Sequence, residues 1–294
     1  MRRHQQMAEA HSNRQPSPTN NMRSTNRFVP MSEYLRDPEL FAAPKLLTSG
    51  WQSWDDAQPL GATERGSISV LAAPPGCYKT ATMLRLARGF AANGSSVTWL
   101  AAEMRPEGLV RRIMCQIAQV SSELLRGDEL PPAESLRLDR AAEALSGVSE
   151  RICIAGSPIT VDDVESAAES SDVVFIDYLQ LVHASHVELR GHERIEDVIS
   201  RVASAAQRNS TSFIIASAQG RSAAHEQRDI HTATKGSSII EYSADALYCA
   251  SGIRTTKDGQ EVEFKCLKQR EGHRRTLVVC IDGRTGLITE EGNP

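Results

Sequence analysis

The stretch LAAPPGCYKTATMLRLA, residues 71–87, determines how the rest of this sequence is interpreted. It begins in an apolar run and continues through a Lys-Thr pair into apolar residues at helical spacing. A strand, a tight loop and a helix N-terminus in this order can bind phosphate, because backbone N–H groups and the helix dipole attract anionic oxygens. The alternative is an ordinary turn before a helix, since Ala73 and Tyr78 stand where the motif G-x-x-x-x-G-K-S/T has glycine.

Length and composition indicate a soluble globular protein. The chain has 294 residues, enough to bury a sizeable core, with 40% hydrophobic and 24% charged residues. It contains no apolar run of about 18 residues and no secretory leader, so we expect no membrane contact and a cytoplasmic location. Six cysteines without a Cys-x-x-Cys pair fit reduced, mostly buried thiols. With a formal net charge of −4, contact with nucleic acid requires a local basic patch.

Composition divides the chain into three parts. Residues 1–30 are polar, with five arginines and one acid, and we expect a disordered, solvated tail. Residues 31–45 predict a short helical linker, broken by Pro38. Residues 46–294 read as one compact domain.

Within this domain, apolar strands alternate with amphipathic helices. This pattern predicts an α/β fold with a mostly parallel sheet flanked by helices and with C-terminal β-hairpins. Thr160 and Asp163 predict a capping box at the start of one helix. Strands are expected at residues 67–72, 96–103, 151–155, 172–177, 212–219, 246–250, 261–269 and 274–281, and helices after residues 79, 106 and 160 and at 134–145 and 193–209.

The phosphate-binding interpretation assigns a role to each residue of the loop. Pro74 and Pro75 have no N–H, so the cradle depends on the N–H groups from Gly76 through Thr80. Lys79 would reach the β- and γ-phosphates of ATP, and Thr80 would hold Mg²⁺. The expected nucleotide-binding segment comprises Ala73, Pro74, Pro75, Gly76, Cys77, Tyr78, Lys79 and Thr80.

Three polar residues at the ends of later strands complete a candidate ATPase site. Asp177 closes VVFID and suits a Mg²⁺ shell, and Glu103 closes the strand after the first helix and suits a base for the attacking water. Gln219 closes SFIIASAQ and suits a γ-phosphate sensor. Such residues can also be plain loop caps, but three of them in this order after a phosphate loop favour an active site.

These segments, taken together, resemble the RecA-type motor domain of DnaB-type replicative helicases. The resemblance extends from about Leu47 to the C-terminus, and FIDYLQL and KGSSIIEYSADALY followed by KQREG are its most specific parts. The other matching segments are LTSGWQSWDD, LAAPPGCYKT, WLAAEM and IIASAQ.

The resemblance implies a site shared between subunits. Arg270 would be an arginine finger that reaches the ATP of a neighbouring subunit, with Lys268 as its companion and further ligand. A finger supplied in trans implies a homo-oligomer, in this family a hexamer. The alternative for KQREGHRR is a basic hairpin edge that prevents aggregation.

The resemblance also implies two DNA-contacting loops in the channel of the ring, at residues 183–194 and 220–236. The second loop carries Arg221, Arg228 and Lys235, which could follow the backbone of single-stranded DNA. The first loop contains histidines, but without carboxylate or thiolate partners at fixed spacing they indicate a polar loop rather than a metal site.

The expected function is therefore an ATP- and Mg²⁺-dependent ring motor that moves on single-stranded DNA in replication. Tyr78 departs from the family motif, and the helical N-terminal collar of replicative helicases is not recognisable here. A loader or primase partner is part of the family pattern. The alternatives are an ATPase that remodels a protein or DNA complex without unwinding, and a nucleotide-binding scaffold without turnover.

Overall fold

The computed structural model describes residues 29–38, 42–127, 129–186, 188–219, 238–256 and 259–289. The chain divides into two units, Met1–Pro44 and Lys45–Pro294. In the first unit, helix α1 (Met31–Tyr34) has no buried residue and ends before Pro38. The expected tail lies outside the described residues, except for its last two positions.

The second unit alternates strands and helices along the chain. Its first elements are β1 (Leu46–Leu47), α2 (Gln52–Ala57), β2 (Thr63–Glu64), β3 (Ile68–Ala73), α3 (Lys79–Ala92), β4 (Val97–Ala101), α4 (Pro106–Ala118) and α5 (Pro132–Ser149). They are followed by β5 (Ile152–Gly156), α6 (Val161–Ser170), β6 (Val173–Asp177), α7 (Gly191–Asn209), β7 (Ser212–Ala218), α8 (Ser238–Ser243), β8 (Ala246–Thr256), β9 (Gly259–Gln269), β10 (Leu277–Ile281) and β11 (Ile288–Thr289).

Nine of these strands form one sheet, in the order β11-β10-β9-β8-β3-β7-β6-β4-β5. The strands from β8 to β5 in this order are all parallel, and β9, β10 and β11 continue the sheet as antiparallel hairpins. The mostly parallel sheet and the C-terminal hairpins predicted from the sequence are therefore confirmed.

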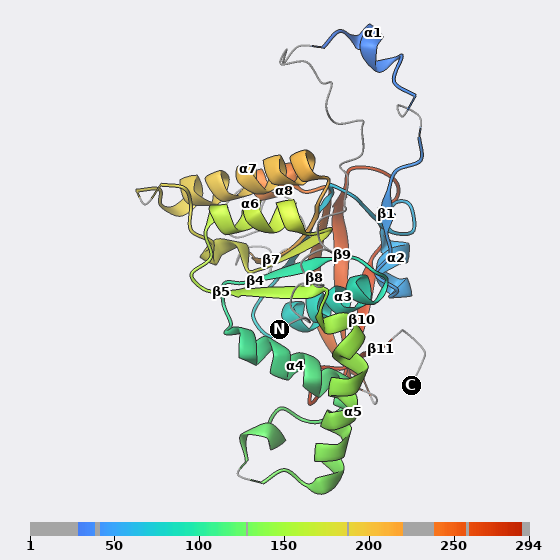
Figure 1. The fold of residues 1–294 in the computed structure, drawn as a ribbon, viewed down its shortest axis with the longest axis vertical. Helices are drawn as coiled ribbons and strands as arrows, with labels where there is room; N and C mark the ends of the chain where they lie inside the picture. Colours follow the sequence, from blue (N-terminus) through green and yellow to red (C-terminus); the bar gives the residue numbers. More distant parts are fainter. Residues whose placement is uncertain are drawn as a thin grey trace, which may run out of the picture. The chain divides into compact units, whose positions relative to one another are not determined.

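Helices cover both faces of the sheet (Figure 1). Alternate residues of β3 point to opposite faces, so Leu71 packs in the core beneath α3 and Val70 packs in the core beneath α6 and α7. In β3, β4 and β6 every residue is buried, because both faces are covered. This burial explains why these strands are mostly apolar, with one polar residue in each.

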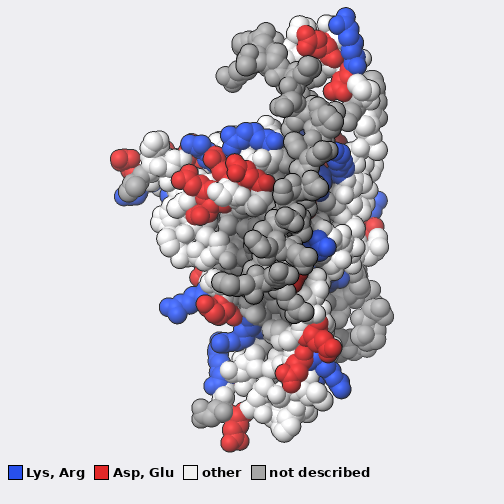
Figure 2. All heavy atoms as spheres, viewed as in Figure 1, with Lys and Arg blue, Asp and Glu red and all other residues white. Residues whose placement is uncertain are grey.

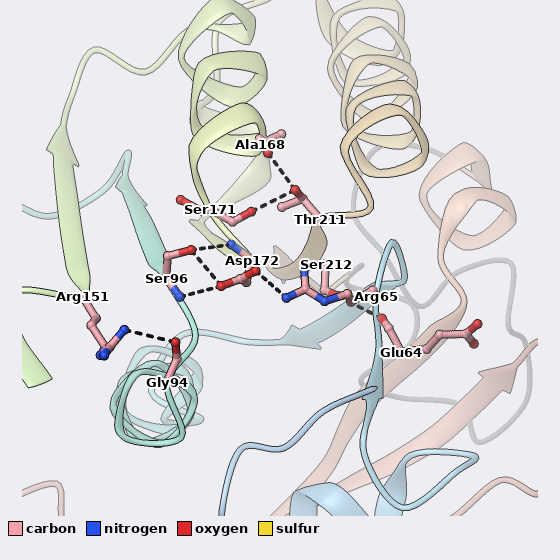
Figure 3. Close-up of polar contacts among 10 residues, drawn as sticks. All are labelled: Glu64, Arg65, Gly94, Ser96, Arg151, Ala168, Ser171, Asp172, Thr211 and Ser212. Carbon is pink, nitrogen blue, oxygen red and sulfur yellow. Dashed lines mark hydrogen bonds and ion pairs between the residues drawn. The ribbon is translucent and has the colours of Figure 1, made fainter. Parts of the chain in front are cut away.

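Polar side chains join the parallel strands at their amino ends (Figure 3). The carboxylate of Asp172 accepts hydrogen bonds from the N–H and the hydroxyl of Ser96, each at 2.8 Å, and pairs with the guanidinium of Arg65. The hydroxyl of Thr211 donates to the carbonyls of Ala168, at 2.7 Å, and Ser171, at 2.9 Å. These contacts fix the starts of β4, β6 and β7 relative to one another, and thereby the register at which the same strands end.

The helix boundaries differ from the sequence-based expectations at three places. The expected helix at 134–145 is longer, because α5 begins at Pro132 and ends at Ser149. Helix α7 begins at Gly191, inside the segment expected to be a loop. Helix α2 and the β1–β2 pair were not predicted, whereas the capping box of Thr160 and Asp163 is present.

Among the described residues, no helix is both long enough and apolar enough to cross a bilayer.

Candidate ATPase site

The candidate site residues gather where four neighbouring strands end. In the sheet, β3, β7, β6 and β4 are adjacent and parallel, so their carboxyl ends meet at one edge. The loop that contains Lys79 follows β3, and Gln219 follows β7. Asp177 ends β6, and Glu103 lies two residues beyond β4. A cavity of about 620 Å³ opens at this edge, and Lys79, Thr80, Glu103 and Asp177 line it.

The loop after β3 has the backbone of a phosphate loop. Gly76 and Tyr78 both have left-handed φ angles, of 83° and 53°, and α3 begins immediately afterwards at Lys79. The ammonium group of Lys79 donates hydrogen bonds to the carbonyls of Ala73 at 2.6 Å and Pro74 at 3.1 Å, so it lies across the loop. Burial lowers the pKa of Lys79, while the carboxylates of Asp177 and Glu103 oppose this shift. An anionic ligand in the cavity would stabilise the buried ammonium.

Thr80 and Asp177 form a pair of oxygen ligands suited to Mg²⁺. The Thr80 hydroxyl donates to Asp177 Oδ2 at 2.8 Å, and only 3% of Asp177 is exposed. Burial raises the pKa of Asp177, and the nearby charge of Glu103 adds to the increase. A divalent cation would compensate this buried carboxylate, so the two residues fit the ion. Mg²⁺ commonly takes one or two protein ligands together with water and phosphate oxygens. No group of three or more His, Cys, Asp or Glu residues that could hold a metal ion occurs in the described part of the chain.

Glu103 lies beside this pair but is open to solvent. Its backbone N–H donates to the carbonyl of Asp177 at 3.1 Å, and Ala102 N–H donates to the same carbonyl at 3.0 Å. These bonds hold the Glu103 backbone at the end of β6, while the exposed side chain lines the cavity. If the cavity holds phosphates, a carboxylate in this position can accept a proton from a water molecule that approaches them.

Gln219 and a glutamine that was not predicted connect β7 to the site. The N–H of Gln219 donates to Ala73 O at 3.4 Å, and its buried side-chain Oε1 has no hydrogen-bond partner among the described residues. Gln180 Nε2 donates to the hydroxyl of Ser217 at 2.8 Å, and its Oε1 accepts from Ala218 N–H at 3.2 Å. A polar residue inside the apolar segment FIDYLQL was the available signal for Gln180. Gln180 thus ties the segment after Asp177 to the end of β7.

Arg112 was also missed by the sequence reasoning. It lies on α4, lines the cavity, and its charge lowers the pKa of Asp177 against the larger effect of burial. On the sequence it is one of several basic residues flanking the buried face of a helix, so only the fold distinguishes it.

Lys268 and Arg270 lie at the opposite edge of the sheet. Strand pairing aligns Ser69 with Ala246 and Ala246 with Gln269, so the end of β9 is level with the start of β3, with β8 between them. The loop with Lys79 follows the other end of β3, and a strand of this length spans about 20 Å. Arg270 therefore cannot reach the phosphate loop of its own chain.

Both basic side chains are held against the end of α8. Lys268 Nζ donates to the carbonyls of Glu241, at 2.7 Å, and Tyr242, at 3.0 Å. Arg270 Nη2 donates to the same Tyr242 carbonyl at 3.2 Å, and its Nη1 lies 2.8 Å from a carboxylate oxygen of Asp245. About half of the Arg270 side chain is exposed, at 54%, so it is accessible to a second molecule.

Only one of the two expected DNA-contacting loops can be described. Arg221, Arg228 and Lys235 lie outside the described residues. In the first loop, Arg194 Nη2 donates to the carbonyl of Gln180 at 2.6 Å, so the start of α7 is bonded to the segment after Asp177. On the face drawn in Figure 2, the basic and acidic side chains of the described residues are interspersed.

This order of strands, with a phosphate loop after β3 and acids after β4 and β6, defines a RecA-like domain of the P-loop class. The solved structure of a DnaB-like replicative helicase, described together with its interactions with primase, has the same fold. It superposes with a TM-score of 0.74 at 18% identity and covers 88% of this chain and 65% of that chain.

The chain belongs to the family described as DnaB-like helicase C terminal domain, which matches residues 47–288. The replicative DNA helicase DnaB of Geobacillus stearothermophilus is 29% identical over 224 residues, which cover 71% of this chain and 49% of that protein. A probable plasmid replicative DNA helicase of Chlamydia trachomatis is 29% identical over 152 residues, covering 49% of this chain and 33% of the relative. The resemblance inferred from the motifs is confirmed, and the chain spans about half or less of the length of these relatives.

Proposed function

We propose that this chain is an ATP-hydrolysing motor that acts on single-stranded DNA as a ring of identical subunits during replication. The contact between Thr80 and Asp177 beside Lys79 carries the proposal. It joins a phosphate loop, a buried acid and an ammonium group in one cavity. Family membership supports the helicase role.

The residues of the cavity divide the chemistry among them. Lys79 and the N–H groups from Gly76 to Thr80 bind the phosphates of ATP. Thr80 and Asp177 would hold Mg²⁺, which supplies neutralisation of the charge on the transferred phosphoryl group. Glu103 positions the attacking water and takes its proton. Gln219, at the end of β7, senses whether the γ-phosphate is present.

The far edge of the sheet supplies the rest of the site to a neighbour. Arg270 is remote from its own phosphate loop but exposed, so a second copy must provide the nucleotide that it contacts. Lys268 lies beside it on the same carbonyl and acts with it. Repetition of this head-to-tail contact closes a ring, and we propose a hexamer with single-stranded DNA in its channel, contacted by Arg221, Arg228 and Lys235. A loader or primase would act on this ring.

Steady-state ATP hydrolysis with and without single-stranded DNA tests the proposal. We expect turnover that DNA stimulates and that Lys79→Ala abolishes. Turnover indifferent to DNA would instead support an ATPase that remodels a protein or DNA complex, and a forked duplex would distinguish unwinding from translocation alone. Nucleotide binding without any turnover would reduce the protein to a binding scaffold.

Mixing two inactive variants tests the shared site. Lys79→Ala lacks the phosphate contact and Arg270→Ala lacks the finger, so each ring alone is inactive. In rings assembled from equal amounts, about a quarter of the interfaces combine an intact Lys79 with an intact Arg270 from the neighbour. We expect activity to return in the mixture. Two variants that stay inactive when mixed, although both form rings with wild-type protein, would contradict a finger supplied in trans.

A further inference from the structure

Tyr78 occupies a backbone conformation that normally favours glycine. Its φ of 53° lies in the left-handed region, which is unfavourable for a residue with a side chain. It is also the position at which the phosphate-loop motif has glycine. Some contact of the side chain must therefore offset the strain in the loop.

The structure shows this contact in the C-terminal strands. The phenol hydroxyl of Tyr78 donates to Gln260 Oε1 at 2.6 Å, on β9 and 182 positions away along the chain. The turn after β10 leaves room for the ring, because a Cβ built on Gly283 would lie only 3.0 Å from the hydroxyl oxygen. The side chain thus extends toward the C-terminal part of the sheet, where its hydroxyl lies beside β9 and the turn after β10.

The turn after β10 forms one wall of the nucleotide cavity. Tyr78, Gly283, Arg284, Thr285 and Gly286 line the cavity together with Lys79 and Thr80. Gln260 pairs with Ile281, the last residue of β10 before this turn, so its bond to Tyr78 connects the phosphate loop to the strands that support this wall.

We propose that Tyr78 is a positioning residue for nucleotide binding, whose hydroxyl, bonded to Gln260, holds the phosphate loop in its binding conformation. The inference rests on the proposed function only in taking this loop as the site of the ATP phosphates. When the bond is lost, the strained loop relaxes in the empty protein, and the nucleotide must restore the left-handed backbone as it binds. This cost applies equally to the bound substrate and to the transition state, so affinity falls and kcat does not.

Binding of MgADP and steady-state ATP hydrolysis by Tyr78→Phe, Gln260→Met and the double variant test this inference. The two substitutions keep the shape of the side chains and remove the hydroxyl or its acceptor. From the usual net value of one hydrogen bond, we expect each to raise the Kd for MgADP and the KM for ATP roughly 3- to 10-fold, with kcat unchanged. The double variant should bind no more weakly than either single one, because both remove the same bond.

Tyr248→Phe is the matched control for the loss of a tyrosine hydrogen bond elsewhere. The Tyr248 hydroxyl donates to Ala57 O at 2.9 Å in the core, and it does not line the cavity. Tyr248→Phe should lower the unfolding midpoint without changing the Kd for MgADP. If Tyr78→Phe behaves like this control, or lowers kcat at constant KM, or adds its effect to that of Gln260→Met, the inference is wrong.

The binding experiment separates this inference from the proposed function. Lys79→Ala should abolish MgADP binding and so show that the measured Kd belongs to this loop. Wild-type protein that binds MgADP but shows no DNA-stimulated turnover would refute the motor, while the effect of Tyr78→Phe on Kd would still decide the positioning role. Wild-type protein that binds no MgADP would refute both.

Discussion

Gly89 should contribute to the stability of the domain, although glycine is an unfavourable residue inside a helix. It lies within α3, the helix that follows the phosphate loop. A Cβ added to Gly89 would be 2.0 Å from the carbonyl oxygen of Ser49. Ser49 is fully buried, and its N–H and hydroxyl donate to Asp55 Oδ1 at 3.0 and 2.8 Å. The carbonyl therefore has little freedom to move.

The magnitude follows from two opposing effects. Replacing glycine by alanine in a helix interior stabilises a protein by about 1 kcal/mol through helix propensity. An ordinary carbon–oxygen contact is about 3.3 Å, so Gly89→Ala must displace the Ser49 segment or α3 by roughly 1 Å. Overpacking of a buried site costs about 1–3 kcal/mol, and a rigid backbone contact belongs at the upper end of this range. We expect a net loss of about 2 kcal/mol.

Urea unfolding followed by tryptophan fluorescence measures this difference, since Trp51, Trp54 and Trp99 are all buried. Gly147→Ala is the matched control, because Gly147 lies inside α5 and nothing is within 4 Å of its added Cβ. That substitution should stabilise the domain by about 0.5–1 kcal/mol. Equal stability of the two variants would refute the steric argument.

Three further predictions concern ionisable groups. Burial alone would raise the pKa of Asp172, but hydrogen bonds from Ser96 and Arg65 lower it overall. The ionised carboxylate therefore stabilises the folded domain fully above the ordinary carboxyl pKa, and this contribution is lost as the pH falls through the lowered pKa. Asp172→Asn should cost roughly 1–3 kcal/mol at pH 7 and flatten the acid limb of the stability curve. The pKa shift of Asp177 has the opposite sign, because burial raises it, so the ionised carboxylate destabilises the folded domain at pH 7. Asp177→Asn should therefore raise the unfolding midpoint of nucleotide-free protein and abolish turnover. Burial raises the pKa of Cys249 to about 12, so in the folded protein iodoacetamide at pH 8 should modify the exposed Cys153 and leave Cys249 unmodified, as peptide mass spectrometry would show.

Each of these predictions has a result that contradicts it. If stability falls with decreasing pH in the same way in wild type and Asp172→Asn, the carboxylate of Asp172 does not stabilise the domain. Asp177→Asn protein that is less stable than wild type would show that the contact with Thr80 outweighs the burial of charge. Labelling of Cys249 at the rate of Cys153 would mean that β8 opens readily.

Much of the sheet could be predicted because its strands are buried on both faces. The central parts of these strands, such as residues 173–176 and 213–216, are apolar at every position, and this pattern depends on local composition alone. The ends of these strands carry Asp177 and Gln219, so the gathering of the candidate site at one edge followed from the parallel order. The roles assigned to these residues remain predictions.

The features that could not be predicted depend on contacts between distant segments. Helix α2 contains only six residues and is held by Asp55, whose partners Thr48, Ser49 and Gly50 precede it in an irregular segment. No periodicity marks such a network. The contact of Tyr78 with Gln260 likewise joins two positions that sequence spacing does not relate. Without this contact, Tyr78 appears only as a departure from the motif.

Strand β9 connects the two halves of the proposed mechanism. Its start carries Gln260, which is bonded to the phosphate loop of the same chain, and its end carries Lys268, followed by Arg270 at the opposite edge of the sheet. Because Arg270 is remote from its own phosphate loop, a nucleotide that it contacts belongs to another copy. A change at Gln260 should then affect the site of its own subunit, whereas a change at Arg270 should affect the site of the neighbour. In a mixed ring, a nucleotide site should therefore be impaired when the subunit that binds the nucleotide carries the Gln260 substitution. It should also be impaired when the adjacent subunit carries the Arg270 substitution.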